Sequence, residues 1–420
     1  MSFFNWNKKK DESQEALLYD KDDNKDLKND TITTKATAPP RFHYYDGLRG
    51  WASLQVYASH NYSQSFHKVD SNGLFTKIFK NILIGRRYHI PIFFVLSGRL
   101  IALSLLKRPT LPNFTSTCVR RVLRLGFPLF GGFFLFWFFG ALGFYKINVL
   151  SEELKKNSPI AYLNHFKENP WVKDPDWRQF SRIFFGIAQL FNFHNLSYPV
   201  QGVIWTLYVE FFNSYYIYIL AMIASQCNVV GKVLIYSVVQ IFSLFSFRSE
   251  PHTPDGNAAY FVGGLIIAEL ANAGLYKWIN TKSYWWIVHA IFFFIPIVAF
   301  VPDVQASVED FINNDIYKRL IMTKGSEVID NNWVKDRQVW FRVDLFRYLV
   351  GTCCITLLEL NSIVRGLFST KVMKWLGMAS YGLYLIHPMW SSIMYGRLIP
   401  IVDTLFSGFS HLTQAGFKIN

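Results

Sequence analysis

The 420-residue sequence has little charge and few cysteines, and each shortage excludes a class of protein. Charged residues make up 17% of the chain, whereas average soluble domains are about 25% charged. The length also exceeds the roughly 250–300 residues at which one soluble core stops growing. The 4 cysteines show no CxxC spacing, so the sequence indicates neither a disulfide framework nor a zinc site.

The sequence also lacks the short motifs of common soluble enzymes. It contains no GxSxG, P-loop, GxGxxG, HExxH or EF-hand pattern, and these patterns carry the nucleophile, phosphate or metal chemistry of their classes. Soluble hydrolase, kinase and dinucleotide chemistry are therefore not supported. No metal cofactor is expected.

Apolar residues are abundant, at 51% of the chain, and they come in long blocks. About 20 apolar residues are needed to cross a ~30 Å hydrocarbon core. Residues 183–196 are too short to span untilted, and residues 399–417 are ambiguous. The sequence predicts an all-α fold, a polytopic integral membrane helix bundle with about 10 transmembrane helices. The candidate spans are residues 45–66, 88–106, 125–145, 203–224, 229–247, 257–275, 283–301, 344–363 and 375–396.

The positive charge is distributed as in a membrane protein. The net charge is +14, yet basic and acidic residues balance in the polar tail, residues 1–41. The excess flanks the apolar blocks, which fits lipid headgroups and the positive-inside rule and argues against nucleic-acid binding. The basic stretch 107–124 predicts a cytosolic loop after the second span, which favours a cytosolic N-terminus. We expect a transmembrane domain over residues 42–400, with a long polar loop at 302–342, and a C-terminal tail over 401–420.

Several ionisable residues fall inside the apolar blocks, where each is a candidate for function because burying charge in lipid is costly. Arg49 and His60 are 11 residues apart in the first block, so they share a helix face and lie roughly 16 Å apart along its axis. A histidine can act as a general base near neutral pH. A polar residue that joins helices is the alternative for His60. Asp46 is placed like a helix N-cap.

Other polar residues allow more than one interpretation. Glu210 needs a partner: it can orient His60, or it can form a structural ion pair with Arg99. His387 is either a second base or a structural group that fixes a tautomer. Arg121 and Arg124 suit phosphate oxygens, but they also suit an anionic lipid surface.

Five short patterns occur in order along this apolar region. In this order they resemble the membrane-bound acyltransferase-3 family, and the variant is similar to the branch found in fungi. Arg99 departs from the family pattern, which usually has an apolar or aromatic residue there. The five patterns are DGLRG at 46–50 with His60, FFVLSG at 93–98, the pair Arg121 and Arg124 with Pro128, WTLYVE at 205–210, and SYGLYLIHP at 380–388.

The resemblance implies a ten-helix membrane enzyme that moves an acyl group, commonly acetyl from acetyl-CoA, to a hydroxyl of a carbohydrate, lipid or natural product. It implies that His60 is the base, with Arg49 essential beside it. Arg121 and Arg124 would lie near the CoA phosphates on the cytosolic side. Asp46, Glu210 and His387 are motif positions without an assigned task. The host membrane would be the plasma membrane or an endomembrane.

Two other functions compete with this one. A transporter or channel can also place His, Arg and Glu in a membrane path. A catalytically degenerate scaffold is the other alternative, and the presence of His60, Arg49 and Glu210 argues against it. For an enzyme, direct attack on the thioester and a covalent acyl intermediate on His60 both fit the sequence.

Overall fold

The computed structural model describes five stretches of the chain, residues 42–65, 88–142, 201–244, 254–301 and 345–393, together with Ser307 and Phe311. The expected tails, the 302–342 loop apart from those two residues, and the segments 183–196 and 399–417 lie outside the described part.

Every regular element in the described stretches is helical, which confirms the all-α prediction. All nine predicted spans coincide with helices, and their ends differ by a few residues except in one case. The remaining elements are the short helices α13 (Leu275–Asn280), α19 (Ser362–Phe368) and η5 (Asp255–Asn257). The nine are α2 (His43–Ser65), α4 (His89–Lys107), α5 (Leu111–Ala141), α10 (Gln201–Ser225), α11 (Val229–Leu244), α12 (Ala258–Asn272), α14 (Trp285–Phe300), α18 (Leu345–Leu360) and α20 (Lys371–Ile393).

Membrane character is clear, although fewer spans than predicted pass a test of length and composition. Within the described stretches, α4, α5 and α10 are each long and apolar enough to cross a membrane. Helices α18 and α19 are bent by 103° relative to each other, and counting them together as one broken span raises the total to 4. Large apolar side chains on α11 and α14, such as Phe242 and Phe294, point outward, as expected for helices that contact lipid. The total of about ten crossings remains a prediction.

Helix α5 corrects one expectation. The basic stretch 107–124 was expected to be a loop, but only residues 108–110 separate α4 from α5. A proline in the first turn of α5 is compatible with helix initiation, and no glycine or further proline interrupts the chain before the apolar block. Arg120, Arg121 and Arg124 therefore belong to the helix. With 31 residues the helix is about 46 Å long, which exceeds a ~30 Å hydrocarbon core.

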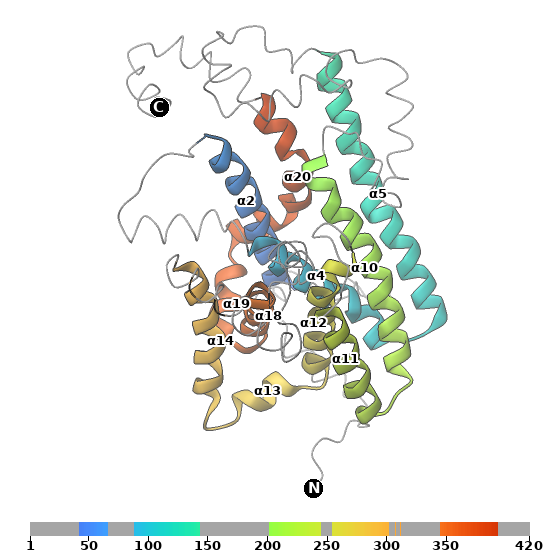
Figure 1. Cartoon of the computed structure of the whole chain (residues 1–420), viewed down its shortest axis with the longest axis vertical. Coiled ribbons are helices and arrows are strands. Elements are labelled where there is room, and N and C mark those ends of the chain that lie inside the picture. Colours follow the sequence, from blue (N-terminus) through green and yellow to red (C-terminus); the bar gives the residue numbers. More distant parts are fainter. Residues whose placement is uncertain are drawn as a thin grey trace, which may run out of the picture.

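Helix α4 lies at the centre of the bundle and packs against α2, α5, α10, α12 and α18 (Figure 1). Two glycines bring α4 and α12 together. A Cβ atom on Gly98 would lie 2.2 Å from the carbonyl oxygen of Phe261, and one on Gly264 would lie 2.1 Å from that of Val95. Small residues allow such close helix packing in membranes, which gives Gly98 of the FFVLSG pattern a structural reason.

Helices α2 and α20 form the most extensive pair in the described part, and they lie side by side in Figure 1. Gly50 of α2 meets Gly377 of α20, and His60 meets His387 further along both helices. The two helices therefore run in the same direction. This pairing joins the first and last sequence patterns.

Candidate active site

Two histidines meet between α2 and α20. The ring centroids of His60 and His387 are 5.1 Å apart, with the ring planes inclined by 46°. His387 is 1% exposed, and His60 is partly exposed. Tyr57 of α2 packs edge-on to His387 at 6.4 Å. The structure thus brings together two residues that are 327 positions apart, and no pattern in the sequence predicts this pairing.

The tautomer of His387 follows from its contacts. Its Nδ1 lies 2.6 Å from the backbone carbonyl oxygen of Tyr384. A carbonyl oxygen only accepts, so Nδ1 carries the hydrogen and donates it. The neutral ring then keeps its lone pair on Nε2. That atom is buried and has no hydrogen-bond partner in the described part of the chain. This arrangement leaves Nε2 able to accept a hydrogen bond, and the choice between a second base and a tautomer-fixing group stays open.

A small cavity lies one helical turn from His60. Its lining residues include Ser53, His89, Thr206 and Tyr384 together with Val56, and the surface that they present to it is almost entirely apolar. Val56 and His60 are four residues apart on α2, so they share one face. The hydroxyl groups of Thr206 and Tyr384 hydrogen-bond to each other across the cavity wall. The cavity therefore lies between α2, α4, α10 and α20, next to the histidine pair.

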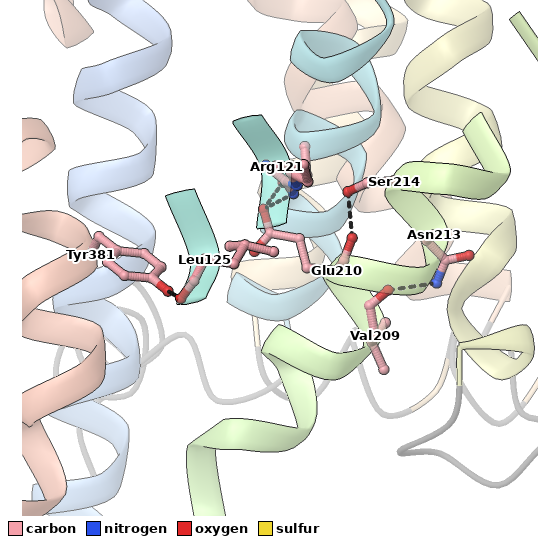
Figure 2. A network of polar contacts seen from close by, with 8 residues as sticks. Arg121, Leu125, Val209, Glu210, Asn213, Ser214 and Tyr381 are labelled. Atoms are coloured by element: carbon pink, nitrogen blue, oxygen red, sulfur yellow. Dashed lines mark hydrogen bonds and ion pairs between the residues drawn. The ribbon is translucent and has the colours of Figure 1, made fainter. Parts of the chain in front are cut away.

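Glu210 is held by two donors in the middle of the bundle. Its Oε1 accepts hydrogen bonds from the Ser97 hydroxyl at 2.8 Å and from Arg121 Nη2 at 2.6 Å. Figure 2 shows this contact between α10 and α5, with Tyr381 of α20 donating to the Leu125 carbonyl nearby at 3.3 Å. Glu210, Ser97 and Arg121 are all buried. The carboxylate thus joins α4, α5 and α10.

Arg49 belongs to the same charged neighbourhood. Its Nη1 lies 3.4 Å from Asp46 Oδ1, and its charge lies near those of Glu210, Arg121 and Arg124. The N-cap expectation for Asp46 is wrong, because α2 begins three residues earlier, at His43. The Arg49 side chain is 21% exposed, three times the 7% of Arg121. The DGLRG, FFVLSG and WTLYVE patterns therefore meet the pair Arg121 and Arg124 here. The structure gathers the seven predicted residues into two groups: the histidine pair and this charged cluster.

Arg121 and Arg124 differ in accessibility. Arg121 is buried against Glu210, whereas Arg124 is exposed on the next turn of α5. Arg120 is also exposed, and its guanidinium donates to the Ser116 hydroxyl. Of the two arginines expected to bind phosphate, Arg124 is thus the one that a ligand can reach directly.

The suggested Glu210–Arg99 ion pair is wrong. Arg99 Nε instead donates to Glu359 Oε1 at 2.7 Å, and Glu210 pairs with Arg121. Arg99 follows Ser97 by two residues on α4, so the two side chains point to opposite sides of that helix. The sequence analysis missed Glu359 and Ser97 as partners. An acidic residue near the end of an apolar block was the available signal for Glu359.

The described residues contain no group of three or more His, Cys, Asp or Glu side chains that could hold a metal ion. Structural and catalytic zinc sites use three or four protein ligands.

Comparison with known proteins agrees with the geometry. A family model for an acyltransferase domain, of the acyltransferase-3 type, matches residues 42–413, which is most of the chain. No curated protein and no solved structure matches the sequence. The matched region contains both groups of candidate site residues. The chain therefore belongs to the acyltransferase-3 family and is a membrane acyltransferase.

Proposed function

We propose that this multi-pass membrane enzyme transfers an acetyl group from acetyl-CoA to a hydroxyl of a carbohydrate, lipid or natural product. His60 is the general base. The observation that carries the proposal is the histidine pair beside a cavity among four helices. We place the N-terminus and the donor side in the cytosol, as the basic residues near α5 favour.

In the proposed reaction His60 removes the proton from the acceptor hydroxyl. The hydroxyl oxygen attacks the thioester carbonyl, the tetrahedral intermediate collapses, and the C–S bond breaks. The leaving CoA sulfur takes the proton from His60, so no net proton is released. A positioned base of this kind contributes about 10²–10⁴-fold to rate. Direct transfer needs no covalent intermediate.

His387 orients His60 in this scheme. Its Nδ1 is committed to the Tyr384 carbonyl, so the Nε2 lone pair is available on a ring that packs against His60. Accepting a hydrogen bond from His60 would fix the tautomer of the base and direct its other nitrogen towards the acceptor hydroxyl. His387 is thus a positioning residue.

Donor binding fits the separation of the two groups of residues. Coenzyme A carries its thioester at the end of a long pantetheine arm, remote from its phosphates. Phosphate ligands must therefore lie well away from the base. Arg49 is roughly 16 Å from His60 along α2, and it interacts with the exposed Arg124. We assign phosphate binding to Arg124 and Arg49, while Arg121 holds Glu210 in place.

The cavity beside His60 leaves room for no more than a short acyl group. The space open to a water-sized group is about 10 Å³, roughly what one water molecule needs. Phe93 and Phe94 form part of its wall. The acyl methyl group would face these rings, and the carbonyl would face His60.

The test is transfer of label from radiolabelled acetyl-CoA in membranes that contain the full chain. Variant His60→Ala is compared with the native chain at equal abundance. His289→Ala is the matched control, because His289 lies in α14, which packs on α18. Its Nδ1 contacts the Trp285 carbonyl at 2.8 Å.

We expect His60→Ala to lose about 10²-fold or more of the transfer and His289→Ala to keep it. Label on a lipid or glycan would identify the acceptor. Absence of His60-dependent label with several acyl-CoA donors, in correctly inserted protein, would contradict the proposal. Substrate flux without acyl-CoA turnover would then favour a transporter.

A further inference from the structure

A second buried charged cluster lies beneath the first turn of α2. Arg99 of α4 and Glu359 of α18 form an ion pair with an Nε–Oε1 distance of 2.7 Å. The Tyr45 hydroxyl of α2 donates to the same carboxylate oxygen. The Arg99 guanidinium also lies over the Tyr45 ring, 5.6 Å from its centroid. Three helices are thus joined through one carboxylate.

The cluster is closed to solvent. Arg99 is 4% exposed, Glu359 is 9% exposed, and Tyr45 is 1% exposed. Arg99 Nη1 is buried and has no hydrogen-bond partner within the described stretches. A buried pair whose donors are incompletely satisfied is often no more stabilising than well-packed apolar side chains. Stability alone therefore does not explain why these charges lie here.

The location of Tyr45 suggests what the cluster does. Tyr45 directly precedes Asp46, and Asp46 contacts Arg49. On its other side the start of α2 packs closely on the end of α19 through Gly47, which meets Phe368, and on α20 through Gly50. The cluster therefore fixes the first turn of α2 from the side opposite α20.

Helix α4 links this cluster to Glu210. Ser97 donates to Glu210, and Arg99, two residues later, donates to Glu359. Gly98 between them holds α4 tightly against α12. One short segment thus sets the positions of Glu210 on one side and of the α2 turn on the other.

We propose that Tyr45, Arg99 and Glu359 are positioning residues that hold Arg49 in register with the acyl-CoA donor. Small displacements of a substrate-binding group can cost about 10²-fold in rate. The inference rests on the proposed donor-binding role of Arg49.

The test uses Tyr45→Phe, which removes one hydroxyl and keeps the ring that packs against Arg99. A second variant, Arg99→Met with Glu359→Met, removes both charges together and leaves no unpaired buried ion. The matched control is Lys232→Met with Glu269→Met. This control pair is partly buried, with Lys232 16% and Glu269 6% exposed and an Nζ–Oε1 distance of 2.5 Å, but it joins α11 to α12. Arg49→Ala is the reference variant. Each is purified, its melting temperature is measured, and kcat and KM for acetyl-CoA are determined.

We expect Tyr45→Phe and the Arg99/Glu359 double variant to lose roughly ten- to a hundredfold in kcat/KM for acetyl-CoA. Their melting temperatures should match that of the control pair, which should keep native kinetics. Native kcat/KM in both test variants would overturn the inference, and so would a loss that only follows the folded fraction. If Arg49→Ala were also silent, the proposed role of Arg49 would fail as well. If both test variants were silent beside an impaired Arg49→Ala, the positioning role alone would be overturned.

Discussion

Gly50 of α2 and Gly377 of α20 meet so closely that a Cβ atom on Gly50 would lie 2.5 Å from the Gly377 backbone nitrogen. A contact this close fixes both the separation and the register of the two helices. Three turns further along α2, His60 meets His387. The DGLRG pattern therefore supports the site in two ways, through Arg49 and through the glycine that allows helix contact.

We expect Gly50→Ala to separate α2 from α20 and to lower both stability and activity. Overpacking a well-packed core typically costs about 1–3 kcal/mol. Gly131→Ala is the matched control, because a Cβ atom there meets nothing within 4 Å. Replacing a helical glycine by alanine at such a site stabilises by about 0.5–1 kcal/mol. Thermal unfolding in detergent and acetyl transfer measure both effects; equal behaviour of the two variants would contradict the role of the close contact.

The Arg121–Glu210 pair makes a second prediction, because breaking one partner leaves a buried charge. We expect Glu210→Gln to destabilise the protein by about 3–5 kcal/mol. Arg121→Met combined with Glu210→Met should recover most of that stability, since no uncompensated ion remains.

Activity should stay low in this double variant, because the carboxylate that binds Ser97 and Arg121 is gone. Thermal unfolding and transfer assays on the single and double variants separate the two effects. A double variant with native activity would show that the pair serves stability alone.

The positions of the helices could be predicted from the sequence, because each apolar block has a length that only a helix satisfies in lipid. The start of helix α5 was the exception, because its arginines are typical of a loop. Burial of Arg121 inside the bundle is possible only because Glu210 pairs with it, and Glu210 lies 89 residues away in the sequence. Local composition does not reveal such a partner.

The residues of the candidate site could be named from the five patterns, but their grouping could not. The contact between His60 and His387 depends on how α2 and α20 pack. The exchange of partners among Arg99, Arg121, Glu210 and Glu359 has the same origin. A sequence shows which charged side chains need partners. Only the packing of the helices decides which carboxylate each arginine meets.

Donor binding through Arg124 gives a third prediction. We expect Arg124→Ala to raise the KM for acetyl-CoA about tenfold or more, the value of one hydrogen bond to a charged group, while kcat changes little. Arg120→Ala is the control, because Arg120 is equally exposed but donates to Ser116. An acetyl-pantetheine donor that lacks the phosphates should show no difference between native chain and variant. A KM that is unchanged by Arg124→Ala would assign the phosphates to other residues.

The cavity beside His60 gives the last prediction, on acyl chain length. Val56 is buried, lines the cavity and lies one turn before His60, so its size limits the room for the acyl chain. Val56→Ala should increase kcat/KM for butyryl-CoA relative to acetyl-CoA by about 10–200-fold, since one methylene in an apolar pocket is worth about 1–3 kcal/mol. Val56→Phe should suppress transfer of both chains by filling the space.

Leu129→Ala controls for a general loosening of the bundle, because Leu129 is equally buried but belongs to a separate apolar cluster between α5, α10 and α20. If Leu129→Ala shifted the chain-length preference as much as Val56→Ala, the effect would come from flexibility of the bundle. A preference that moves only with Val56 places the acyl chain next to α2. Because Val56 and His60 share one face of that helix, the same result would place the thioester carbonyl within reach of the base.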